Sequence, residues 1–274
     1  MKNLIARTLS GLLFLAIMIG CILWNVYAFF GLSCVIVVVG MIEFFNMFIP
    51  KANKWQKILS ICAGICLISF VFIAKNISVL EIIYVENLFI ASLIFLTSIP
   101  IIELYTKSEE PAKNIALLII PVFYIVLPFM LMQTMNDDSD KLLAFFILIW
   151  ANDVGAYCFG MLFGQHGKHK LFPRISPKKS WEGFIGGIIT AIAASILVSK
   201  FMLHENMHHW IIIAIITAVL GTFGDLVESM LKRSAGVKDS GKIIPGHGGI
   251  LDRFDAVLLS FPIVFVYIKI FILI

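Results

Sequence analysis

Charged side chains are scarce in this chain. Asp, Glu, Lys and Arg make up 14% of its 274 residues, against about 25% in soluble domains. Apolar residues account for 60%, and this excess excludes a soluble globular domain, because it must face lipid. A helix that crosses the hydrocarbon core needs about 20 apolar residues. The sequence predicts an all-α, polytopic integral membrane protein with about nine transmembrane helices, near residues 4–25, 27–49, 57–75, 80–105, 114–135, 142–164, 184–203, 210–231 and 250–273.

Cysteine is also sparse, and its placement excludes a disulfide framework. All five cysteines lie within apolar stretches, as small buried hydrophobic residues do. They are Cys21, Cys34, Cys62, Cys66 and Cys158. A cleavable signal peptide is not predicted either, because no small-residue cleavage site follows Lys2, Arg7 and the first apolar run. We therefore expect the first apolar stretch to be retained as a membrane span.

The chain also lacks the sequence features of two further functional classes. The chain has no internal repeat and no paired halves, which disfavours an ion-coupled transporter of the inverted-repeat type. Residues 236–242 match G-x-x-x-x-G-K, but Ile243 stands where a P-loop needs Ser or Thr, and no strand is predicted before them. A Walker-type nucleotide site is therefore excluded.

The positive charges that are present lie mostly on one side of the predicted spans. If the N-terminus is placed on side one, 16 of the 21 Lys and Arg residues fall on that side. The positive-inside rule makes side one cytoplasmic. We therefore expect the long loops 165–183 and 232–249 to be cytoplasmic, and the segment 204–209 to lie outside.

Carboxylates interrupt several predicted spans, where each would cost about 2.5–3.5 kcal/mol if it faced lipid at the bilayer centre. The seven are Glu43, Glu103, Asp153, Asp225, Glu228, Asp252 and Asp255. They must face the protein interior, a water-filled cavity or a cation. Glu43 and Glu103 lie near predicted cytoplasmic ends, where snorkelling or polar packing explains them. The other five lie from residue 152 onward, where the predicted function is concentrated.

Asp225, Glu228 and Lys232 are spaced i, i+3, i+7 and share one helical face. Asp252 and Asp255 begin the next span after a short loop, so the two helices are predicted to be antiparallel neighbours. Asp225 and Asp252 then lie at similar depths and form an oxygen site suited to Mg²⁺. Glu228 and Asp255 are predicted to support this pair. The alternative is an internal salt-bridge network with Lys232, Arg233 and Arg253.

The loop between these helices has the residues that bind phosphates. Its cations can neutralise phosphate groups, and its glycines let backbone N–H groups approach an anion. The cations are Lys232, Arg233, Lys238 and Lys242, and the glycine-rich turn comprises Gly246, His247, Gly248 and Gly249. Anchoring to anionic lipid headgroups is the alternative, but Asp239, Asp252 and Asp255 interleave with the cations and argue against it.

Two more segments are candidates for substrate binding. Ser176-Pro-Lys178-Lys179-Ser180-Trp-Glu182-Gly183 lies just before a span and is interpreted as a phosphate-binding helix start. Asn152 and Asp153 interrupt an apolar run, which is more often functional than structural. His204 and His208 have metal-ligand spacing, but no carboxylate or cysteine reinforces them, so an interfacial polar role is favoured.

Several of these motifs resemble the phosphatidate cytidylyltransferases, also called CDP-diacylglycerol synthases. The resemblance lies in Ser229-x-Leu-Lys232-Arg233, Lys238-Asp239 and His247-Gly-Gly-x-x-Asp252-Arg253-Phe-Asp255. Asn152-Asp153-x-x-Ala-Tyr157 and Ser176–Gly183 are also similar, although Thr is commoner than Ser at position 180 in that family. The resemblance is strong over about residues 150–260 and only compositional before them.

The resemblance implies a reaction in which CTP and phosphatidic acid give CDP-diacylglycerol and pyrophosphate, with Mg²⁺ as cofactor. It also implies a homodimer in a bacterial cytoplasmic (inner) membrane, an active site that faces the cytoplasm and no nucleic-acid partner. Residues 1–140 are then structural or dimer-forming, and residues 141–274 are catalytic. A polyprenol kinase, another CTP-using membrane enzyme, remains an alternative.

Within that reaction each candidate residue has a predicted role. Asp225 and Asp252 hold Mg²⁺, and Lys232, Arg233 and Lys238 grip phosphates. The remaining substrate-binding candidates are Asn152, Asp153, Ser176, Lys178, Lys179, Ser180, Glu182, Asp239, His247, Gly248, Gly249, Arg253 and Asp255. No general base is needed, because phosphatidic acid is already anionic at neutral pH.

Overall fold

The computed structural model describes residues 2–76, 82–135, 137–164, 169–244, 246 and 248–272. It divides the chain into two compact units. Unit 1 comprises residues 1–137 and 239–251, and unit 2 comprises residues 138–238 and 252–274. The boundary near residue 138 lies close to the predicted division at 140. The return of residues 239–251 to unit 1 was not predicted. The functional roles given to the two parts stay predictions.

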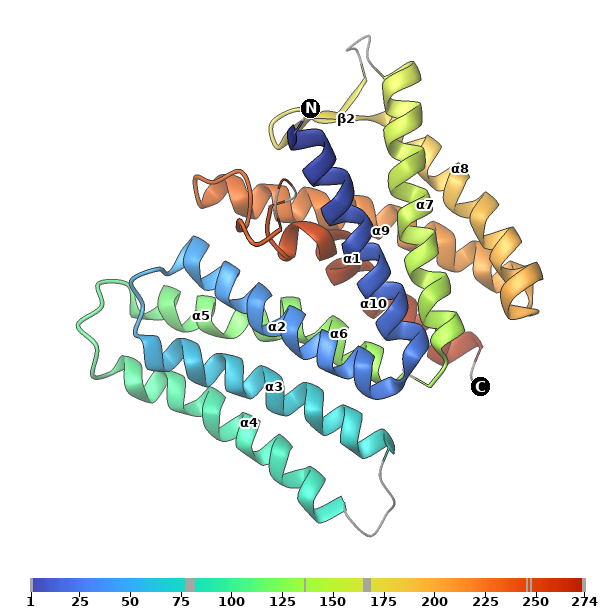
Figure 1. The fold of residues 1–274 in the computed structure, drawn as a ribbon. Coiled ribbons are helices and arrows are strands. Elements are labelled where there is room, and N and C mark those ends of the chain that lie inside the picture. The colour runs from blue at the N-terminus through green and yellow to red at the C-terminus, as the bar shows by residue number, and fades with distance from the viewer. Residues whose placement is uncertain are drawn as a thin grey trace. The chain divides into compact units, whose positions relative to one another are not determined.

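Unit 1 is built from consecutive apolar helices (Figure 1). They are α1 (Lys2–Trp24), α2 (Val26–Phe48), α3 (Lys54–Asn76), α4 (Ile82–Glu103), α5 (Pro111–Pro121), η2 (Val122–Val126) and α6 (Leu127–Gln133). The Asn25 side chain begins α2 by accepting a hydrogen bond from the Ala28 N–H at 2.8 Å. Buried aromatic rings, among them Phe29, Phe44 and Phe129, fill the interior.

Unit 2 holds a longer set of helices and a small β-hairpin. Its elements are α7 (Ser139–Phe163), β1 (Lys170–Phe172), β2 (Ser176–Ser180), α8 (Trp181–Val198), η3 (Ser199–Leu203), α9 (Met207–Ser234) and α10 (Leu251–Phe271), whose first residue belongs to unit 1. Strands β1 and β2 pair antiparallel. The rings of Phe145 on α7 and Phe261 on α10 meet edge to face at 5.0 Å between centroids.

The all-α membrane class is confirmed. Among the described residues, eight helical spans are long and apolar enough to cross a bilayer, and α1 contributes a shorter apolar stretch, Thr8–Trp24. Every predicted span coincides with one of these nine segments, but the count of nine transmembrane helices stays a prediction. The span predicted at 114–135 is not one regular helix, because the five-residue π-helical turn η2 separates α5 from α6 between Pro121 and Pro128.

Candidate active site

A cavity of about 400 Å³ lies within unit 2. It is lined by α7, the β-hairpin, α8, α9 and α10. Nine residues predicted from the sequence lie on its wall: Asn152, Asp153, Lys178, Lys179, Ser180, Asp225, Asp252, Arg253 and Asp255. Residues from motifs about 100 positions apart in the chain therefore line a single cavity. Gly221, Thr222 and Ala256 complete the wall where α9 meets α10 and were not predicted.

Small residues let α7 and α8 approach closely beside this cavity (Figure 1). A Cβ atom on Gly155 would lie 1.6 Å from the Thr190 hydroxyl, and one on Gly187 would lie 2.5 Å from the Asn152 amide oxygen. Helices in membranes associate through such close packing, because lipid supplies little hydrophobic drive between them. The glycines of this pair therefore determine where Asn152 and Asp153 stand.

Glycine also allows close contact between α9 and α10. A Cβ atom on Gly224 would lie only 2.3 Å from the backbone carbonyl oxygen of Asp255. Because Gly224 directly precedes Asp225, this contact places Asp225 beside the first turn of α10. The two helices predicted to be neighbours thus meet at a glycine.

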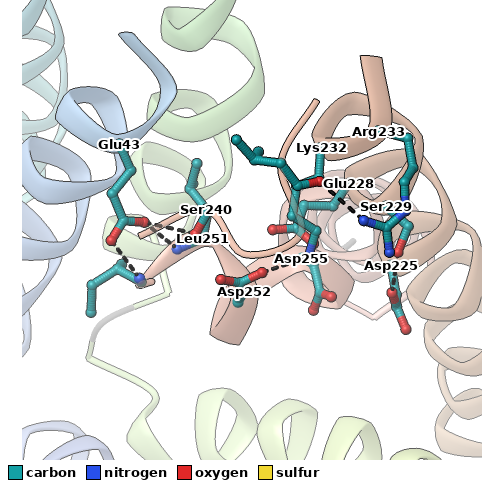
Figure 2. Close-up of polar contacts among 12 residues, drawn as sticks. Glu43, Asp225, Glu228, Ser229, Lys232, Arg233, Ser240, Leu251, Asp252 and Asp255 are labelled. Atoms are coloured by element: carbon teal, nitrogen blue, oxygen red, sulfur yellow. Dashed lines mark hydrogen bonds and ion pairs between the residues drawn. The ribbon is translucent and has the colours of Figure 1, made fainter. Parts of the chain in front are cut away.

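Three carboxylates converge at this helix crossing (Figure 2). One oxygen each from Asp225, Glu228 and Asp255 can be chosen so that all lie within 4.8 Å of one another. The Glu228 side chain is only 2% exposed, and three closely spaced hard oxygen donors suit a divalent cation. From the sequence, Glu228 and Asp255 are expected to support the metal ligands. The assignment of Asp225 and Asp252 as the metal ligands stays a prediction.

Asp252 lies in an ion-pair network at the same crossing (Figure 2). The Lys232 ammonium group forms salt bridges with both Glu228 and Asp252. The Lys232 side chain is 11% exposed and that of Asp252 is 7% exposed. Glu228 therefore belongs both to the ion-pair network with Lys232 and Asp252 and to the carboxylate cluster with Asp225 and Asp255.

The basic segment before α8 reaches the same carboxylates. The Lys179 ammonium group lies 2.7 Å from Asp225 and donates to the backbone carbonyl of Thr222 at 3.3 Å. Lys178 is exposed at the cavity wall. The segment 176–180 is the strand β2, and Ser180 then begins α8 by accepting from the Gly183 N–H at 3.1 Å. The predicted helix start is present, preceded by a strand that was not predicted.

The other predicted residues that the structure describes are not among those that line the cavity. Arg233 donates to the carbonyl of Val237 at 3.0 Å, Lys238 is exposed, and Glu182 pairs with His169 at 3.1 Å. Ser176 begins β2 but is not on the wall. Asp239, Gly248 and Gly249 belong to unit 1. His247 lies outside the described residues.

The interfacial polar role of His204 and His208 stays a prediction. Neither belongs to a cluster of three or more metal-binding side chains within the described part of the chain. His204 is the residue that ends η3, in the left-handed conformation with φ 52°. The neighbouring His209 ring lies 2.9 Å from the Tyr267 hydroxyl.

Glu43 has a structural partner that sequence reasoning missed. Its carboxylate lies in α2 and accepts hydrogen bonds from Ser240, Ile250 and Leu251, all within unit 1 (Figure 2). Both Glu43 and Glu103 are 4% exposed, which favours polar packing over snorkelling. A carboxylate within an apolar span was the available signal, but the sequence does not identify a partner about 200 positions away.

Comparison with known proteins places these residues in a family. A model of the cytidylyltransferase family matches residues 5–271. A phosphatidate cytidylyltransferase of Staphylococcus epidermidis is 33% identical over 259 residues, covering 94% of this chain and 96% of the relative. The Staphylococcus saprophyticus protein of the same name is 34% identical over 261 residues, with the same coverage. That of Staphylococcus haemolyticus is 41% identical over 184 residues, covering 66% and 69%.

The match extends across both units, and the motifs quoted from the sequence lie within it. The cavity of unit 2 is lined by residues of the motifs that carried the resemblance: the Asn-Asp pair of α7, the Lys-Lys-Ser end of the segment 176–180, and the two aspartates of α10. This chain belongs to the cytidylyltransferase family, among the phosphatidate cytidylyltransferases.

Proposed function

We propose that this chain transfers the cytidylyl group of CTP to phosphatidic acid, giving CDP-diacylglycerol and pyrophosphate for phospholipid biosynthesis. The observation that carries the proposal is the cavity of unit 2, which is lined by three cations and four carboxylates. The cations are Lys178, Lys179 and Arg253, and the carboxylates are Asp153, Asp225, Asp252 and Asp255. Cations beside clustered carboxylates suit a metal-bound triphosphate. The apolar helices around the cavity suit a substrate whose acyl chains remain in the bilayer.

The reaction is an in-line displacement at the α-phosphorus of CTP. A phosphate oxygen of phosphatidic acid forms the new P–O bond, the bond from the α-phosphorus to the bridging oxygen breaks, and pyrophosphate leaves with that electron pair. Such transfers require little covalent chemistry from the protein, so positioning and charge neutralisation dominate. The attacking phosphate is already an anion, and no side chain has to remove a proton from it.

The lysine and arginine side chains have different roles in this reaction. Lys179, held 2.7 Å from Asp225, positions the acidic cluster and neutralises phosphate at the cavity wall. Lys178 and Arg253 are exposed there and contact phosphate groups of CTP or of the lipid. Lys232 orients Asp252 and Glu228. Arg233 and Lys238 bind phosphates from the end of α9.

The residues present fit a Mg²⁺ ion. Asp225 is common to the pair predicted from the sequence, Asp225 with Asp252, and to the cluster of Asp225, Glu228 and Asp255. When bound, the ion supplies positive charge against the triphosphate. Asp225 would hold it in either arrangement, and the remaining carboxylates complete or orient the ligand set.

The membrane orientation and assembly belong to the same proposal. The cavity opens to the cytoplasm, where CTP is found, because the basic loops 165–183 and 232–249 follow the positive-inside rule. The protein lies in the inner (cytoplasmic) membrane of a bacterium and acts as a homodimer.

The reaction can be tested with CTP that carries an isotope label at one chosen phosphorus atom. Purified protein in detergent is given phosphatidic acid, Mg²⁺ and CTP labelled at either the α- or the γ-phosphorus. Cytidylyl transfer puts the α-label into the lipid fraction and the γ-label into pyrophosphate. A lipid labelled from the γ-position would instead identify a CTP-dependent kinase. An ion-coupled transporter would label no lipid, so either result would contradict the proposal.

A further inference from the structure

Glu43 is a buried carboxylate that the cavity of unit 2 does not explain. Its side chain lies in α2 and is 4% exposed. One oxygen accepts from the Ile250 N–H at 2.9 Å. The other accepts from the Leu251 N–H and from the Ser240 hydroxyl, each at 3.0 Å. The carboxylate therefore binds both ends of the segment 240–251 (Figure 2).

The partners of Glu43 call for a negative charge. Two of the three donors are backbone amides at the start of α10, where the helix dipole favours an anion. Charge-assisted hydrogen bonds of this kind are about twice as strong as neutral ones. A neutral amide at this position could accept with only one atom and would present N–H groups to donors.

The surrounding backbone is shaped to this carboxylate. A Cβ atom on Gly241 would lie 2.3 Å from a Glu43 oxygen, and one on Gly249 would lie 2.4 Å from the other. The two glycines therefore leave room for the carboxylate between the two arms of the segment, residues 240–241 and 249–251. Any larger residue at either position would displace it.

Between those arms, an isolated β-bridge joins Ile244 and Gly248, while Lys242 and Ile243 are exposed. Gly246 and Gly248 both have positive φ, 76° and 86°, which glycine adopts without the strain that other residues incur. Glu43 joins the two arms at the base of this segment.

We propose that Glu43 is a positioning residue for cytidylyl transfer. It closes the segment 240–251 and fixes the first turn of α10, which begins at Leu251. Asp252, Arg253 and Asp255 follow in that turn and line the cavity of unit 2. Glu43, which is not among the residues that line the cavity, thereby determines whether these side chains are held ready for the substrate. The kinetic part of this inference rests on the proposed function.

The test is Glu43→Gln, studied as the full-length protein in detergent. Limited trypsin digestion measures closure, since cleavage of a closed loop tracks its transient opening. Cleavage after Lys242 should accelerate by about 10-fold or more, as expected for lost charge-assisted hydrogen bonds. Cleavage after Lys107, an exposed residue between α4 and α5, should keep its wild-type rate. The kcat/KM for CTP should fall by about 10-fold or more.

Glu103→Gln is the matched control. Glu103 is also 4% exposed in unit 1, but it accepts from Gln56 and Asn114 and not from the segment 240–251. Its variant should show wild-type cleavage after Lys242. Gly249→Ala should reproduce the Glu43→Gln phenotype, and the double variant should be no worse than either single one. If Glu43→Gln does not fold, Ser240→Ala removes one donor and should open the segment a few-fold.

Three results would overturn the inference. Wild-type cleavage after Lys242 in Glu43→Gln would show that Glu43 does not close the segment. Faster cleavage with unchanged CTP kinetics would reduce Glu43 to a structural residue. An equal loss in Glu103→Gln would indicate general destabilisation. Absence of cytidylyl transfer in the wild-type protein would refute the proposed function alone, because the digestion result does not depend on it.

Discussion

Lys232 illustrates how burial changes the role of a residue. Its sequence context predicts a phosphate ligand, but in the structure its ammonium group pairs with Glu228 and Asp252, whose side chains are 2% and 7% exposed. Removing one partner from a buried ion pair leaves an uncompensated charge, which costs about 3–5 kcal/mol. A phosphate ligand alone could be removed from a folded protein, whereas loss of this buried partner should also lower the stability of the fold.

Lys232→Met should lower the thermal unfolding temperature in detergent and abolish transfer. Lys238→Ala is the control, because Lys238 is exposed and comes after the end of α9. It should leave the unfolding temperature unchanged and raise the KM for CTP, since a charge-assisted phosphate contact contributes about 1.5–3 kcal/mol. Equal unfolding temperatures for the two variants would contradict the buried network.

The two candidate ligand sets for Mg²⁺ make different predictions. Asp225→Asn should reduce kcat by about 100-fold or more in both, because a hard cation needs the lost charge. If the cluster holds the ion, Asp255→Asn should raise the Mg²⁺ concentration needed for half-maximal rate, and Asp252→Asn should change it little. If the pair holds it, the order reverses. A Mg²⁺ titration of each variant decides, and unchanged activity in Asp225→Asn would contradict both sets.

At the scale of elements, apolar runs long enough to span a bilayer were sufficient to predict the helices. The β-hairpin escaped prediction because the short segment from Lys170 to Ser180 carries no alternating pattern. The π-helical turns η2 and η3 were not predicted either, because apolar composition does not show whether an N–H group donates to the fourth or the fifth preceding carbonyl. In the site, charge spacing identified Asp225 and Asp252. It could not show that Asp252 pairs with Lys232, because that depends on how α9 and α10 cross.

Glycine packing between α9 and α10 yields a prediction at this scale. Gly224→Ala would place a Cβ atom 2.3 Å from the Asp255 carbonyl, and backbone cannot move aside cheaply. The variant should lose about 1–3 kcal/mol of stability through overpacking, and transfer should fall with it. Gly31→Ala in α2, where nothing lies within 4 Å, is the control and should unfold at or slightly above the wild-type temperature. Similar unfolding temperatures for both variants would contradict the close crossing.

At the scale of the whole molecule, the division into two units could not be predicted from composition, because residues 239–251 belong to the N-terminal unit. The chain enters unit 1 again for residues 239–251 after most of unit 2 is complete. That return depends on Glu43, about 200 positions earlier in the sequence. Neither hydropathy nor motif spacing carries such information, since it resides in hydrogen bonds to the backbone.

Membrane orientation is a prediction about the entire chain. In a variant without native cysteine, single cysteines are introduced as Arg174→Cys and Asn206→Cys, both at exposed positions. Ser180 would be a poor probe, because it is 5% exposed. An impermeant thiol reagent on intact cells should label position 206 and spare position 174 until the cells are opened. The reverse pattern would put the loop 165–183 outside and remove the cavity from CTP.

If cytidylyl transfer occurs in the cavity of unit 2, an experimental structure with a non-hydrolysable CTP analogue and Mg²⁺ should show the nucleotide there. A second cavity, of about 810 Å³, lies in unit 1 and is lined by Lys51, Lys107 and Lys113. We expect density for the triphosphate beside Lys179 and Asp225. A triphosphate bound among the three lysines of unit 1, with the cavity of unit 2 empty, would contradict it.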